Sequence, residues 1–144
     1  MSMQDNLQIA HQLLQQLGSG AAPQEIAALF SADLEWHIPG DTAALPWIGR
    51  KSGRGAVEDF VRDSSQLMQR VRLDVHDVLA SNDRAVILGE LVTVITATEK
   101  IIESPFAIVL TIVAGEISSF LMLEDSYAVA AAARPVGMSP VSHG

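Results

Sequence analysis

The chain has 144 residues and no cysteine, and its 17 acidic and 9 basic residues give a formal net charge of −8. This length fits one domain with a core of its own, and an apolar fraction of 49% excludes intrinsic disorder. The missing cysteines exclude disulfides and thiol chemistry, while the negative charge argues against nucleic-acid binding.

The sequence gives no sign of a membrane or a metal partner. The N-terminal segment MSMQDNLQ is polar and lacks the pattern of a secretory signal, and the longest apolar run, 106–114, is far shorter than the ~20 residues of a membrane helix. We therefore expect a cytoplasmic protein without a membrane partner. The four histidines have no metal-ligand spacing, so neither a metal nor a cofactor is expected.

The first half of the chain has helical periodicity interrupted by one short strand. Apolar residues recur every three or four positions in three segments, and glycine or proline ends the first helix and the strand. The predicted elements are a helix over 4–17, a short helix from Pro23, a strand over 34–38, a loop over 41–53 and a helix over 54–68.

The second half alternates apolar and polar residues with a period of two, which is typical of strands. Strands are predicted from Val71 and over 84–96, 101–113 and 117–127, as an antiparallel meander. The fold class is therefore α+β, with helices packed on one face of a strongly curved antiparallel sheet. A single domain over 1–127 is expected, followed by a poorly ordered or partner-docking tail over 128–144.

Several of these segments together resemble the nuclear transport factor 2-like superfamily. They are the N-terminal helices, the strand SADLEWHIPG, the glycine-rich entry to a long helix and the late strand GEISSFLMLEDSY. Within that superfamily the chain is most similar to SnoaL-like and ketosteroid-isomerase-related proteins, over roughly residues 5–127. The resemblance implies a cone-shaped α+β barrel of the cystatin-like type, with a cavity between sheet and helices. It leaves the function open, because this fold carries isomerases, cyclases, epoxide hydrolases, transport factors and non-catalytic subunits.

His37 is the first candidate for chemistry. Ketosteroid isomerases place a general-base aspartate at the end of the equivalent strand, and that position falls on His37 here. An imidazole titrates near neutral pH and can transfer a proton without a large pKa shift. The alternative is a partly exposed histidine at a strand end, packed on Trp36 or Trp47.

Three carboxylates are further candidates. Pairing across the two expected turns would place Glu90, Ala107, Met122 and Glu124 on one face of the sheet. Related cyclases and hydrolases carry an acidic residue near the end of the last strand, and either Glu124 or Asp125 fits that place. Only one of the two can face a cavity. For Glu90, pairing with a cation or exposure to solvent are the alternatives.

The segment GRKSGRG places Arg50, Lys51 and Arg54 at the start of a helix, where they could bind a carboxylate or phosphate. The alternative is a solvated face neutralised by Glu58 and Asp59. Large apolar side chains are candidates to line a ligand pocket, with core packing as the alternative. They are Trp36, Trp47, Phe60, Phe106, Phe120 and Met122, and Trp47 is expected at the pocket lip.

The chain departs from two of the active families. Its only tyrosine is Tyr127, and the strand PFAIV lacks the acid that stabilises a dienolate in ketosteroid isomerases. The strand LVTVIT lacks the Arg-x-Asp of limonene-type epoxide hydrolases. A polyketide-cyclase-like reaction needs less, and His37 with Glu124 or Asp125 would supply its acid/base pair.

The resulting hypothesis is a small-molecule pocket protein that acts as a cofactor-independent acid/base isomerase or cyclase on an apolar carbonyl compound. The alternative is a non-catalytic ligand-binding or structural dimer module of the same fold. Strands 84–113 are apolar on both faces, so a homodimer through the outer sheet face is expected.

Overall fold

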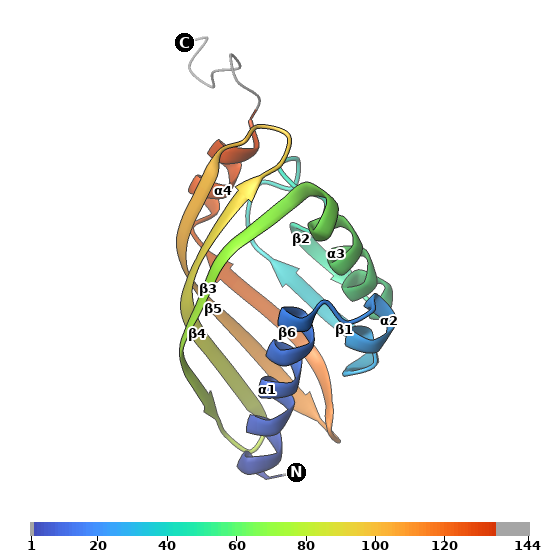
Figure 1. Ribbon diagram of the computed structural model, residues 1–144. Helices are drawn as coiled ribbons and strands as arrows, with labels where there is room; N and C mark the ends of the chain where they lie inside the picture. Colours follow the sequence, from blue (N-terminus) through green and yellow to red (C-terminus); the bar gives the residue numbers. More distant parts are fainter. Residues whose placement is uncertain (1, 135–144) are drawn as a thin grey trace.

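The computed structural model describes residues 2–134 and consists of one curved sheet with helices on its concave side (Figure 1). The sheet has six strands in the order β2-β1-β6-β5-β4-β3. The elements are α1 (Met3–Ser19), α2 (Pro23–Ala27), β1 (Phe30–Ile38), β2 (Gly49–Ser52), α3 (Arg54–Leu67), β3 (Met68–Ala80), β4 (Arg84–Ile95), β5 (Ile101–Val113), β6 (Glu116–Glu124) and α4 (Ser126–Ala133).

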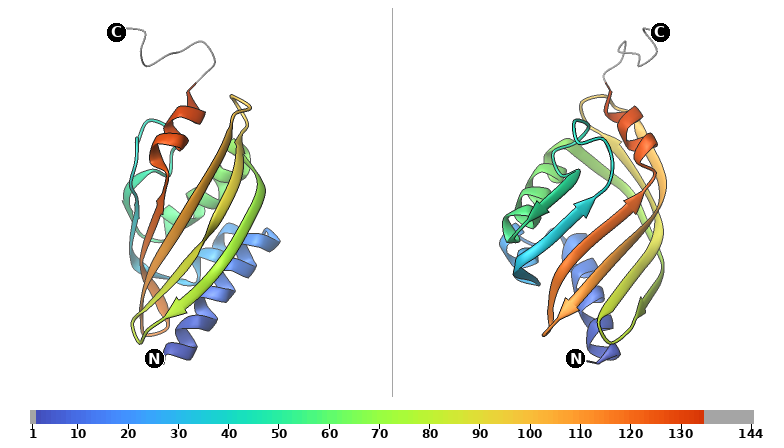
Figure 2. Two further views of the ribbon diagram at one scale, coloured as in Figure 1. Left: turned by 90° about the vertical axis from the view of Figure 1, so that its left-hand side faces the viewer. Right: turned by 180° about the vertical axis from the view of Figure 1, so that it is seen from behind.

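The α+β prediction and the helices on one face of a curved sheet are confirmed. The sheet is mixed and open, however, because β1 pairs with β6 in parallel while all other neighbours are antiparallel. Both views in Figure 2 show this open, strongly twisted sheet. Strands β2 and β3 form its two edges.

Strand β2 lies where the sequence predicted a loop. It contains only GRKS, and its side chains are largely exposed. A short, charged edge strand buries no apolar face, so it has none of the alternation that marks a strand in sequence. Its pairing places Arg50 directly beside His37 of β1.

Helix α1 packs against β3 and β4 with Ala10 and Leu13 fully buried. A capping box between Ser2 and Asp5 begins the helix, and Gly20 ends it in the left-handed conformation. The buried Asn6 side chain donates a hydrogen bond of 3.0 Å to the carbonyl of Ser81 in the β3–β4 turn. This contact ties the start of the helix to the sheet.

The sheet has two faces with different environments. The inner face packs against α1 and α3 and carries buried residues such as Ile87, Leu91 and Phe106, whereas the outer face carries their sequence neighbours, as alternation requires. Gly89 lies on the inner face beneath the Phe106 ring. A side chain there would collide with that ring and with the Asp74 carbonyl, so this close approach requires glycine.

Helix α4 corrects the expectation of a tail that begins at residue 128. Val129, Ala130 and Ala132 are buried, and the helix packs against β5. The Thr98 hydroxyl donates to the Ala132 carbonyl at 2.6 Å. The segment is apolar all round, so it lacks the periodic pattern from which the other helices were predicted. The remainder of the predicted tail, 135–144, lies outside the described residues. Among the described helices, none has the length and apolar character needed to cross a membrane.

Candidate functional site

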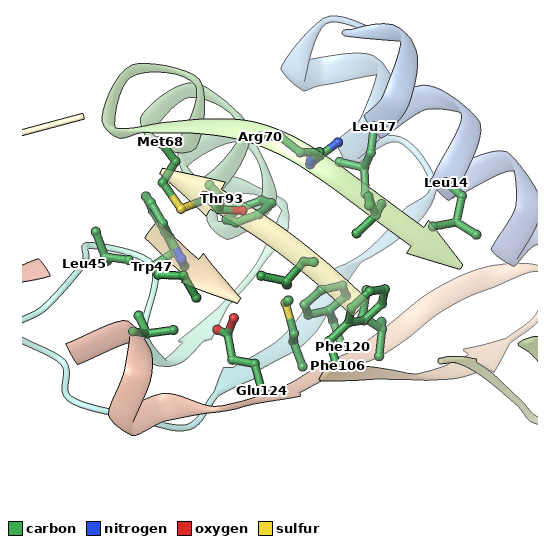
Figure 3. Close-up of a pocket in the computed structure, with 17 residues that line it drawn as sticks. Leu14, Leu17, Leu45, Trp47, Met68, Arg70, Thr93, Phe106, Phe120 and Glu124 are labelled. Atoms are coloured by element: carbon green, nitrogen blue, oxygen red, sulfur yellow. The ribbon is translucent and has the colours of Figure 1, made fainter. Parts of the chain in front are cut away.

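An interior cavity of about 90 Å³ lies between the inner face of the sheet and the helices (Figure 3). Its wall comes from α1, α3, β3 to β6, α4 and the loop before β2, and most of it is leucine, isoleucine, methionine or an aromatic ring. Three polar side chains interrupt this apolar lining: Arg70, Thr93 and Glu124. Any chemistry in the cavity therefore depends on these three groups and on the backbone.

Glu124 ends β6 and is the only carboxylate among the residues that line this cavity. Its register partner is Phe106, so the carboxyl group lies beside an aromatic ring on the inner face. Burial and, to a lesser extent, the nearby charge of Asp125 together raise the pKa of Glu124 from 4.5 to about 7. Within residues 2–134 the carboxylate has no cation within ion-pair distance. No ion pair among the described residues therefore offsets the free-energy cost of ionising the buried Glu124 side chain.

Asp125, the other acid left open by the sequence, has a structural position. Its Oδ1 accepts a hydrogen bond of 2.9 Å from the backbone N–H of Ala128 and caps α4. Its own N–H donates to the Ser104 hydroxyl at 2.8 Å. Asp125 is exposed and does not line the cavity, so Glu124 is the residue of this pair that faces inward.

The predicted grouping of Glu90 and Ala107 with Met122 and Glu124 on one face is wrong. The β5–β6 turn pairs Val113 with Glu116 as expected, but a bulge next to Thr111 then shifts the register by one residue. A shift of one moves every following side chain to the opposite face. Met122 and Glu124 therefore lie on the inner face, while Glu90 pairs with Pro105 and lies exposed on the outer face with Ala107.

His37 also lies on the outer face. Its neighbour Trp36 points inward and stacks on Phe120 at 4.4 Å between ring centroids, so alternation directs His37 outward. It borders a separate depression of about 360 Å³ together with Arg50 and Leu121. The expectation that His37 and Glu124 would face each other across one cavity is wrong, because the sheet separates them. A catalytic role for His37 stays a prediction.

The aromatic candidates divide between core and cavity. Trp47, Phe60, Phe106, Phe120 and Met122 line the cavity. Trp36 is buried in the core instead, and its indole N–H donates to the Trp47 carbonyl at 3.1 Å. That bond holds the loop before β2 in place. The ring of Trp47 then packs edge to face against the ring of Phe60, with 5.5 Å between the ring centroids. Ligand binding by these residues stays a prediction.

The basic segment does not form one clamp. Arg50 lies on β2 beside the outer-face depression, whereas Arg54 begins α3. The Arg54 guanidinium donates to the Phe30 carbonyl at 2.8 Å and forms an ion pair of 3.2 Å with Glu116. These contacts connect the start of α3 to β1 and β6. A role in anion binding stays a prediction for both arginines.

Sequence reasoning missed Arg70 and Thr93. Thr93 stands two residues from both Leu91 and Ile95 on a strand that alternates regularly, so the sequence pattern could have predicted that its side chain lies on the same inner face. Arg70 gave none, because it stands among polar and exposed residues in the first part of β3. The described residues contain no cluster of three or more side chains able to hold a metal ion.

Comparison with known proteins agrees with this architecture. A family model described as SnoaL-like domain matches residues 11–120. An NTF2-like protein from Burkholderia xenovorans LB400 superposes with a TM-score of 0.83 at 23% identity, covering 93% of this chain and 99% of that one. TerC co-crystallised with polyporic acid superposes with a TM-score of 0.74 at 16% identity, covering 90% of this chain and 98% of that one.

A third structure, a putative SnoaL-like polyketide cyclase from Mesorhizobium loti, has a TM-score of 0.66 at 13% identity. The superposition covers 80% of this chain and 95% of that one. No curated protein matches the chain. At these identities the solved structures establish the shared fold alone.

Proposed function

The chain belongs to the SnoaL-like domain family, and from the geometry of its interior cavity we propose that it binds an apolar carbonyl compound and transfers a proton on it through Glu124. The reaction class is a cofactor-independent isomerisation or cyclisation. The observation that carries this proposal is a single carboxyl group in a largely apolar wall, with a pKa raised to about 7. Near neutral pH such a group is present in both the basic and the acidic form.

The steps follow from that one group. The Glu124 carboxylate removes a proton from the carbon next to the substrate carbonyl, which leaves an enolate and a protonated carboxyl. Return of the proton to a different carbon isomerises the compound. In a cyclisation, the enolate carbon instead attacks a second carbonyl of the same molecule and the proton goes to the new alkoxide. Exclusion of water by the apolar wall strengthens the carboxylate as a base.

Proton exchange tests this proposal without knowledge of the natural substrate. The probe is 2-tetralone, a compact apolar ketone, and the measurement is deuterium incorporation next to its carbonyl in D₂O by NMR. We expect exchange above the buffer rate for the unmodified protein, with a midpoint near pH 7, and loss of this excess in Glu124→Gln. Glu90→Gln and His37→Ala, both on the outer face, should retain it. Equal exchange in Glu124→Gln and the unmodified protein would contradict the role of Glu124.

The non-catalytic alternative makes a different prediction with the same probe. A binding module would quench or shift the fluorescence of Trp47 when 2-tetralone enters the cavity, yet exchange would stay at the buffer rate. The apolar lining favours this alternative as much as catalysis, whereas the raised pKa of Glu124 favours catalysis. Binding of 2-tetralone without deuterium exchange above the buffer rate would therefore favour the non-catalytic binding module.

We also propose that a second copy of the chain covers the outer sheet face. That face carries adjoining rows of apolar side chains on β3 to β6, and several are strongly exposed, among them Leu79 at 55% and Leu123 at 44%. Charged groups of both signs are spread over this face. Arg72, Asp74 and Glu90 lie toward the β3 edge, while Glu35, His37 and Arg50 lie toward the β2 edge.

A two-fold axis through the centre of this face would place the same apolar rows of the two copies against each other. Light scattering coupled to size exclusion measures the oligomeric state. Leu88→Lys, in the middle of the outer face, should convert a dimer into monomers, whereas Ser65→Lys on α3 should not. A monomeric unmodified protein at micromolar concentration would contradict the dimer.

A further inference from the structure

The interior cavity continues into a second hollow. A groove of about 210 Å³ lies between α1, α2, α3 and β3, and five residues line both spaces. They are Leu17, Phe60, Met68, Arg70 and Thr93. Ligand pockets commonly enclose ~300–1,000 Å³. The cavity alone falls well below that range, so a ligand that reaches Glu124 is expected to occupy the groove as well.

The polar groups of the shared wall lie together at this junction. Arg70 and Thr93 are directly paired in register across β3 and β4, so their side chains project from the same face as neighbours. Thr93 is only 6% exposed. Between residues 2 and 134 its hydroxyl makes no hydrogen bond, and it is not sealed in the protein interior because the residue lines both hollows.

Arg70 has no carboxylate within ion-pair distance in the described part of the chain. Arg72 on the same strand pairs with Asp74 at 2.8 Å, whereas the exposed Arg70, like Arg50 and Arg84, has no such partner among the described residues. The junction thus holds an exposed guanidinium without an ion-pair partner beside the accessible hydroxyl of a largely buried threonine. Two such donors on one side of a hollow suit a planar anion.

We propose, on the basis of the proposed function of Glu124, that Arg70 and Thr93 bind a carboxylate group of the substrate at the junction of cavity and groove. A guanidinium supplies one positive charge with a fork of N–H donors, which matches a monocarboxylate better than a phosphate dianion. The substrate is then an apolar carboxylic acid whose reactive carbonyl end enters the cavity. Arg70 and Thr93 set its orientation and its chemical class.

The placement of the two ends supports this orientation. Figure 3 shows Arg70 and Glu124 on opposite sides of the hollow, with apolar side chains between them. Three strand steps of about 4.8 Å separate β3 from β6, and Glu124 lies level with Gly89, four residues of β4 away from the Thr93 that pairs with Arg70, so the two side chains start roughly 10–20 Å apart. Two like charges at one site would repel each other, whereas at this distance the substrate carboxylate and Glu124 are kept apart.

The test compares decanoate with its neutral amide, decanamide, by Trp fluorescence and calorimetry at pH 7.5. We expect the unmodified protein to bind decanoate about tenfold more tightly, as charge-assisted hydrogen bonds imply. Arg70→Met should abolish this preference and leave decanamide binding within about twofold. Arg72→Met, which removes the same charge from the outer face of the same strand, should keep the full preference.

Thr93→Val preserves the side-chain shape and provides a second variant. It should reduce the preference for decanoate severalfold, and Arg70→Lys should restore part of what Arg70→Met loses. The inference is overturned if the unmodified protein binds both probes equally, or if both Arg70→Met and Thr93→Val keep the preference. In those cases decanamide still binds, and the proposed pocket survives. Failure of the proposed pocket would instead abolish binding of both probes.

Discussion

The two faces of the sheet carry similar polar groups in different environments. On the inner face, Glu124 lies in an apolar cavity and its pKa is raised to about 7. On the outer face, Glu90 is exposed and His37 borders an open depression. The comparison shows that a residue type near a strand end does not identify a catalytic group. The face on which the side chain lies decides it, because burial is what changes the acid/base properties.

The largest expected difference between the faces concerns stability at two adjacent positions of β1. Trp36→Ala removes a fully buried ring that stacks on Phe120, and should lower the free energy of unfolding by about 3–5 kcal/mol. His37→Ala should change it by less than about 0.5 kcal/mol. Urea unfolding followed by circular dichroism measures both. If both substitutions lowered the free energy of unfolding equally, the side chains of Trp36 and His37 would not lie on a buried and an exposed face of β1.

A smaller difference concerns the pH dependence of stability. Since the folded pKa of Glu124 lies above its ordinary value, the folded protein binds this proton more tightly than the unfolded chain. The contribution of the protonated Glu124 to the stability of the folded protein is fully present below about pH 4.5, and it is lost as the pH rises toward 7. Glu124→Gln should therefore be more stable than the unmodified protein at pH 8, by on the order of 2 kcal/mol, with no gain at pH 4.

Glu90→Gln is the matched control for this measurement, because it makes the same change on the outer face. Urea unfolding at pH 4, 6 and 8 should give parallel curves for Glu90→Gln and the unmodified protein. A gain at pH 8 in both variants would attribute the effect to net charge rather than to the burial of Glu124.

The smallest expected difference separates the two arginines of the basic segment. Arg54→Gln loses the bond to the Phe30 carbonyl and the pair with Glu116, and should destabilise the protein by about 1 kcal/mol. Arg50→Gln removes a charge from an exposed edge strand and should cost less than about 0.5 kcal/mol. Thermal unfolding compares the two. A larger loss for Arg50→Gln would indicate a structural contact of that side chain.

The sequence was sufficient for the fold because the long elements keep their periodicity. The alternation over β4 and β5 and the helical spacing in α1 and α3 predicted four of the main elements near their observed bounds. The same patterns fail where a residue is added or periodicity is absent. The bulge near Thr111 has no signature in sequence, yet it determines that Glu124 faces inward.

The site was predictable in its apolar part and less so in its polar part. Trp47 and Phe60 were identified from their type and position, and they line the cavity. His37 was favoured from a resemblance to another family, but the side-chain direction of a strand residue depends on which neighbour is in the core. Arg70 comes to the cavity through the pairing of β3 with β4, which connects residues far apart in the sequence.

The most direct test is the titration of Glu124 itself. Carbon-13 NMR follows the chemical shift of each glutamate Cδ between pH 3 and pH 9, and the resonance missing from Glu124→Gln identifies the one of interest. A midpoint near pH 7 is predicted for Glu124 in the unmodified protein. A midpoint near 4.5 would show that the carboxyl group is solvated, and would contradict an interior acid/base site.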